Sequence, residues 1–148
     1  MGLKVELKAG ERFILGGCIV TNDNQRIRLL VEGEAPILRE KDIITAEEAN
    51  TPAKRIYLAV ELMYIGRNPN WYHEAYFILM RDLVRAAPST WPHVITVSNH
   101  ILAGQMYKAL KSAKALIAYE EELIDHATRG TNLLCQWPES SPRVANGE

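Results

Sequence analysis

The chain has 148 residues and a formal net charge of −1, with 17 Lys and Arg residues against 18 Asp and Glu residues. This balance excludes a protein that coats nucleic acid through its overall charge, but it allows a small basic site. The first residues lack the apolar core of a signal peptide, and no apolar stretch is long enough to span a membrane. We therefore expect a cytoplasmic protein, and the two distant cysteines, Cys18 and Cys135, fit a reducing compartment.

Residues 1–44 predict a small β-layer. Apolar and charged residues alternate over 3–8, which is the period of a half-buried strand. Further short apolar runs follow at 12–15, 18–21, 26–33 and 37–39. The glycine pair at 16–17 predicts a tight turn or bulge, and TNDNQ (21–25) predicts a hairpin loop. Five strands this short bury little apolar surface alone, so we expect the sheet to need a partner layer or a second copy of itself.

The next segment begins with two helix-start signals. Thr45 and Glu48 fit a capping box that starts a short helical turn. Thr51 and Pro52 fit the cap and first position of a long helix, and Gly66 marks its end. Nearly every residue of this helix is apolar, which predicts either a central helix or a helix in an oligomer interface.

Three further helices are expected at 68–87, 89–102 and 105–126. The buried stripe of the first of these is expected to comprise Tyr72, Ala75, Tyr76, Leu79 and Leu83. Ser89 or Thr90 caps the next helix, although its β-branched residues also suit a strand. The core face of the last helix is expected to comprise Met106, Leu110, Ala113, Ile117 and Ile124.

Together these patterns predict an α+β fold, with a small N-terminal antiparallel β-sheet or barrel-like layer followed by a C-terminal bundle of about four helices. The β subdomain is expected over 1–44 and the helical subdomain over 45–126. Residues 127–148 lack periodicity and predict a flexible tail, in which LLCQW (133–137) either docks or frays.

Signals of enzymatic chemistry are weak. The histidines lie on separate segments, and none joins a Cys or Ser in a nucleophile motif. They are His73, His93, His100 and His126. Cys18 lies in an apolar run and is expected to be a small core residue. We expect no enzyme, no metal site and no cofactor.

Basic residues suggest a different activity. Several share a face of one predicted strand or lie at a strand end, so they could converge on one side of the sheet. The candidate RNA-binding residues are Arg39, Lys8, Lys4, Arg26, Arg28 and Lys41. A separate stripe with a spacing of three comprises Lys108, Lys111 and Lys114. The alternative is ordinary surface charge paired with the nearby acidic residues.

The run ILREKDIITAEEANTPAKRIYLAVELMY (37–64) closely resembles the flagellum biosynthesis repressor family FlbT. LREKDI (38–43), TPAKRIY (51–57) and KALKSAKALIAYEEEL (108–123) resemble it in order and spacing, and the likeness covers roughly residues 2–125. The resemblance implies a bacterial regulator that binds the 5′ untranslated region of flagellin mRNA and represses translation or promotes decay. It also implies a small protein partner, FlaF, and leaves repression versus activation open.

Residues 3–44 also have a fainter resemblance to the carbon storage regulator family, small RNA-binding β proteins that dimerise by exchanging strands. By this likeness, Arg39 in the last strand and Lys8 in the first strand would contact RNA. Glu6 and Leu7 depart from it, because that family has a threonine and an arginine at these positions.

Two hypotheses follow. The first is an RNA-binding post-transcriptional regulator, and the alternative is a protein-interaction adaptor that binds FlaF or flagellin and affects mRNA indirectly. In either case the helical half is expected to supply a homodimer or partner surface. Its leading residues are Ile56, Tyr57, Val60, Met63 and Tyr64.

Overall fold

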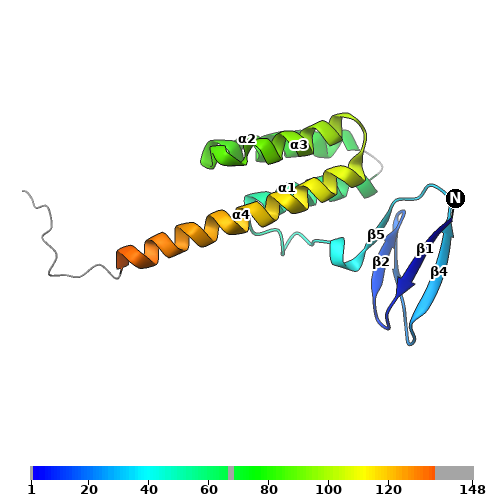
Figure 1. Cartoon of the computed structure of the whole chain (residues 1–148). Helices are drawn as coiled ribbons and strands as arrows, with labels where there is room; N and C mark the ends of the chain where they lie inside the picture. Colours follow the sequence, from blue (N-terminus) through cyan, green and yellow to red (C-terminus); the bar gives the residue numbers. More distant parts are fainter. Residues whose placement is uncertain (1, 67–68, 136–148) are drawn as a thin grey trace, which may run out of the picture.

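The computed structural model describes residues 2–66 and 69–135 (Figure 1). It is an α+β fold, in which a small antiparallel β half is followed by four α-helices, as the sequence predicts. The β half stands beside one end of the helical layers (Figure 1).

The β half consists of two small sheets. Its strands are β1 (Gly2–Leu7), β2 (Arg12–Leu15), β3 (Cys18–Thr21), β4 (Ile27–Glu32) and β5 (Ile37–Arg39). β1 pairs with β4, while the second sheet has the order β3–β2–β5, and all pairs are antiparallel. Gly16, with φ of 61°, makes the turn between β2 and β3, a conformation that favours glycine. Buried Val5, Leu7 and Phe13 form a core within this half.

The expectation that residues 21–25 form a hairpin loop is wrong. This segment joins β3 to β4, which belong to different sheets, so it is a crossover between sheets. Asn22 explains the path, because its buried side-chain amide donates to the carbonyls of Leu7 at 3.2 Å, Lys8 at 2.8 Å and Gln25 at 2.6 Å. Cys18, expected in the core, is exposed.

The helical half contacts one of the two sheets. Its helices are α1 (Pro52–Ile65), α2 (Pro69–Ala86), α3 (Trp91–Leu102) and α4 (Met106–Cys135), with short 3₁₀ turns η1 (Glu40–Asp42) and η2 (Pro88–Thr90). α1 packs against α2 and α4, and α3 packs against α4. Ile14 of β2 and Leu38 of β5 join the core of these helices, so the second sheet packs against the helical half.

α1 follows the sequence signals closely. The Thr51 hydroxyl accepts from the backbone N–H of Lys54 at 3.3 Å, and Pro52 occupies the first turn. The helix ends at Gly66, whose φ is −82°. Glycine is required there because the backbone lies close to the preceding turn, and a Cβ would lie 2.4 Å from the Leu62 carbonyl oxygen.

Three details of the other helices differ from expectation. Ala75 and Ile124 are exposed rather than buried. Thr90 does not cap α3, because its hydroxyl donates back to the Ala87 carbonyl at 2.7 Å. α4 continues past 126 to Cys135, so 127–135 is helical.

The continuation of α4 has a physical explanation. Helix propagation is cooperative, and one glycine inside a helix costs only about 1 kcal/mol relative to alanine. Asp125 and Arg129, four residues apart, form an ion pair of 2.8 Å across this stretch. The expected first residue of the second helix, at position 68, and the tail from 136 onward lie outside the described residues. Among the helices that are described, none combines the length and apolarity that crossing a bilayer requires.

Candidate nucleic-acid interface

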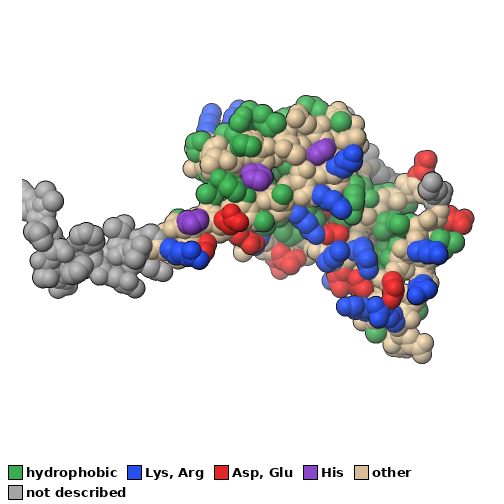
Figure 2. All heavy atoms as spheres, in the orientation of Figure 1, with side chains coloured by type: hydrophobic (Ala, Val, Ile, Leu, Met, Phe, Trp, Pro, Cys, Tyr) green, Lys and Arg blue, Asp and Glu red, His purple; other side chains and the backbone are tan. Residues whose placement is uncertain are grey.

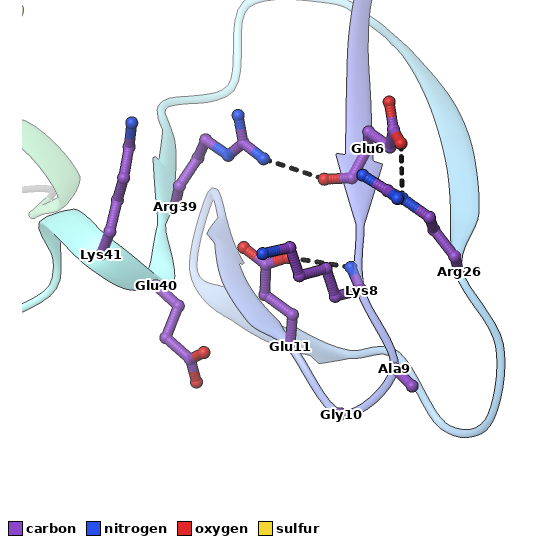
Figure 3. A pocket seen from close by; sticks show the side chains of 9 residues that line it. All are labelled: Glu6, Lys8, Ala9, Gly10, Glu11, Arg26, Arg39, Glu40 and Lys41. Carbon is purple, nitrogen blue, oxygen red and sulfur yellow. Dashed lines mark hydrogen bonds and ion pairs between the residues drawn. The ribbon is translucent and has the colours of Figure 1, made fainter.

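Four of the six predicted cations line one open cavity of about 640 Å³ at the edge of the β half (Figure 3). They are Lys8, Arg26, Arg39 and Lys41. Lys8 follows β1, Arg26 precedes β4, Arg39 ends β5 and Lys41 lies in η1, so both sheets and the first turn after them contribute. Figure 3 shows Arg39 and Lys8 extending into this opening from opposite sides.

Arg39 connects the two sheets at this edge. Its Nη2 donates to the backbone carbonyl of Glu6 at 2.9 Å, across from the last strand to the first (Figure 3). The guanidinium has five N–H donors, so this one bond leaves others that can reach a ligand. The side chain is therefore both held in place and able to bind an anion.

The carboxylates around the cavity are already engaged. Glu6 pairs with Arg26 at 2.6 Å, and Glu40 pairs with Arg12 at 3.2 Å. Glu11 accepts from the backbone N–H of Lys8 at 2.9 Å.

The side chains of Lys8, Arg39 and Lys41 form none of the ion pairs found among the described residues. Four cationic side chains against three carboxylates leave the cavity with a positive balance. The alternative that every cation is paired with a nearby acid does not hold for these three residues.

The remaining two predicted cations lie elsewhere. Lys4 lines an adjacent cavity of about 450 Å³, which it shares with Arg39 and Tyr107. Arg28 lies in β4 opposite Glu6 in the strand register and is not among the residues that line the first cavity. The structure thus brings Lys4 near the group through Arg39 and leaves Arg28 outside it.

Two lysines and a tyrosine of α4 extend the cationic region. Lys111, Lys114 and Tyr107 line a cavity of about 350 Å³ together with Lys41, which also lines the first cavity. Lys114 pairs with Asp42, whereas the Lys111 ammonium lies 5.2 Å from the centre of the Tyr107 ring, within cation–π range. Figure 2 shows Lys and Arg side chains gathered where the β half meets the helices.

This extension was only partly predictable from the sequence. The spacing of three marks the lysine stripe of α4, but its closeness to Lys41 depends on how α4 packs beside η1. No feature of the sequence indicated that Tyr107 belongs to the site, because an exposed aromatic residue near a helix start is common. Tyr107 is 46% exposed in the structure, which leaves area for a stacked ring.

Tyrosines of α1 hold the site in position. The Tyr64 hydroxyl donates to the Ile37 carbonyl at 3.1 Å and accepts from the Ile37 N–H at 3.3 Å. The Tyr57 hydroxyl donates to the Asp42 carbonyl at 2.5 Å. Burial raises the pKa of Tyr57, and Asp42 and Glu61 add to the shift, so this hydroxyl stays protonated and remains a donor.

The residues expected at a partner surface lie inside this chain. Ile56, Tyr57, Val60 and Met63 are buried in the helical core, and Tyr64 is partly buried against it. The reason is that α1 is the central helix, packed by α2 on one side and α4 on another. Ile56, Tyr57, Val60 and Met63 are therefore not accessible to a partner of this folded chain.

The chemistry of the site is that of an anion-binding surface with an aromatic edge. Cationic side chains suit phosphate groups, and an exposed ring suits a nucleobase. Among the described residues, no group of three or more His, Cys, Asp or Glu side chains is arranged to hold a metal ion.

Comparisons with known proteins identify relatives over most of the chain. The family model described as "Flagellar protein FlbT" matches residues 3–124. A protein of Bradyrhizobium diazoefficiens named "Probable flagellum biosynthesis repressor protein FlbT 1" is 58% identical over 83% of this chain and 85% of its own length. A similarly named protein of Rhodopseudomonas palustris (strain TIE-1) is 48% identical over 84% of this chain and 98% of its own length. A similarly named protein of Caulobacter vibrioides (strain ATCC 19089) is 34% identical over 89% of this chain and 96% of its own length. No solved structure matches the chain.

Proposed function

The chain belongs to the FlbT family of flagellar proteins, and from this premise we propose that it binds the 5′ untranslated region of flagellin mRNA and represses translation or promotes decay. Its relatives are named as repressors of flagellum biosynthesis, which is a regulatory role and not that of an enzyme family. The role proposed for this chain places it in the cytoplasm, where the message is translated.

The single observation that carries the proposal is the convergence of cations in one cavity. Lys8, Arg39 and Lys41 come from three separate segments and meet around one opening. Charge-assisted hydrogen bonds to phosphate are stronger than neutral ones, and the guanidinium fork matches phosphate geometry. In a chain of net charge −1, this concentration of cations supports a local site for a polyanion.

Tyr107 favours single-stranded RNA over duplex. Stacking of a base on an aromatic ring contributes about 1–3 kcal/mol and requires an unpaired base. Tyr107 shares one cavity with Arg39 and another with Lys41, so a strand whose phosphates lie along these cations passes beside the ring. We place the phosphates in the cationic cavity and a base against Tyr107.

Replacing Arg39 with alanine tests the proposal. The Arg39→Ala variant should bind a single-stranded flagellin leader RNA at least about tenfold more weakly, because it loses charge-assisted bonds to phosphate. An electrophoretic mobility assay measures the affinity, and far-UV circular dichroism checks that the fold is retained.

Arg55→Ala is the matched control, because Arg55 is an exposed arginine of α1 whose loss changes the charge equally. Equal affinities of the Arg39 and Arg55 variants would count against the site.

The second candidate function is an adaptor that binds FlaF or flagellin. The near-neutral net charge favours it, as does Leu102 at the end of α3, an apolar side chain that is 77% exposed. Purified protein that retains FlaF or flagellin on a column, and never retains RNA, would establish this reading over the first.

A further inference from the structure

α2 presents an apolar face to solvent. Phe77 and Ile78 are 45% and 46% exposed, and Trp91 at the start of α3 is 49% exposed beside them. These side chains line an open groove of about 920 Å³ along α2. Figure 2 shows hydrophobic side chains on the surface of the layer that contains α2 and α3. Adjacent exposed apolar side chains of this size are typical of an interaction surface.

The same face carries unpaired charges. Glu74, Arg81 and Arg85 line the groove with Phe77 and Ile78. Positions 74, 77, 78, 81 and 85 follow helical spacing, so they form one stripe along the helix. The ion pairs found among the described residues involve none of these three charged side chains.

The stripe is complementary to itself when it is reversed. Along the helix, Glu74 and Arg81 lie on opposite sides of the midpoint between Phe77 and Ile78 and at equal distances from it. A second α2 placed antiparallel about that midpoint sets each Glu74 opposite the Arg81 of the other copy. Phe77 of each copy then lies opposite Ile78 of the other copy, close to the two-fold axis. A parallel arrangement would instead place like charges opposite each other.

We propose that the occupant of this face is a second copy of the chain, bound through an antiparallel, two-fold α2–α2 contact. Two-fold dimers use one patch on both subunits, so the patch must match itself in this way. Two Glu74–Arg81 pairs fix the direction and register, while Phe77, Ile78 and Trp91 supply apolar area. This proposal does not depend on RNA binding.

Charge reversal tests the pairing. Glu74→Arg and Arg81→Glu, each alone, set like charges opposite each other twice in a dimer and should raise the dimer dissociation constant by about tenfold or more. Mixing the two single variants creates a heterodimer in which both pairs are again opposite in sign. Sedimentation equilibrium of the full chain is therefore expected to show dimeric wild type, weakened single variants and a restored dimer in the mixture.

The control is Glu121→Arg, a reversal at an exposed position of α4, which should leave the dimer unchanged. Circular dichroism verifies that the single variants fold, and rescue by mixing could not repair a folding defect. A wild type that stays monomeric, single variants that dimerise normally, or a mixture that stays monomeric would each overturn the proposal.

Discussion

Glu61 is a buried carboxylate that fastens the segment after η1 to α1. It is 3% exposed, and its Oε1 accepts from the backbone N–H of Ile44 at 2.8 Å. Burial raises the pKa of Glu61 from 4.5 to about 7, and Glu48 adds repulsion in the same direction, while the Ile44 hydrogen bond opposes the shift. Between these two values the folded chain holds more protons than the unfolded chain, so stability falls as pH rises through the window.

Replacing Glu61 with glutamine should remove this pH dependence. The amide keeps an oxygen that accepts from Ile44 and carries no charge at any pH. The Glu61→Gln variant should therefore gain stability relative to wild type as pH rises from about 5 to about 8. Urea unfolding at both pH values measures the difference, with exposed Glu121→Gln as the control. Parallel pH profiles for wild type and Glu61→Gln would contradict this account.

At the scale of elements, local signals predicted both bounds of α1 but not the end of α4 or which strands pair. Thr51 and Pro52 marked the start of α1 because a cap is made by adjacent residues. The end of α4 was missed because a helix continues through a poor former when its neighbours support it. The 21–25 loop was misassigned because strand pairing is a long-range property that the residues of the loop do not reveal.

The cap of α1 can be tested directly. Thr51→Ala should lower the free energy of unfolding by about 1 kcal/mol, because the N–H of Lys54 loses its hydroxyl acceptor. Thr51→Ser keeps the hydroxyl and should remain close to wild type. Chemical denaturation of the three proteins gives the comparison, and an alanine variant as stable as the serine variant would show that the cap contributes little.

At the scale of the whole molecule, the fold makes one cationic region out of distant segments. The fainter family resemblance pointed to Lys8 and Arg39, which lie on different sheets and line the same cavity. Lys41 lines a cavity with Lys111 and Lys114 because the helical half packs beside η1, and this proximity cannot be predicted from sequence spacing alone. In the proposed dimer two such regions belong to one particle, so one RNA that reaches both gains in overall affinity.

The partner surface was misplaced for a related reason. A helix that is apolar on nearly every side suits a monomer core and an oligomer interface equally, and periodicity cannot separate them. α1 proved to be central, whereas α2 keeps a mixed stripe of Phe77, Ile78 and charged residues on its outer side.

The most direct test of the central claim is the salt dependence of RNA affinity for wild type and the Lys8→Ala/Arg39→Ala variant. For single strands, each phosphate contact adds about 0.7 to the slope of log Kd against log salt concentration. If these two cations each hold one phosphate, the variant's slope should be smaller than that of wild type by about 1.4. Equal slopes for the two proteins, or no binding of wild type at low salt, would contradict the account.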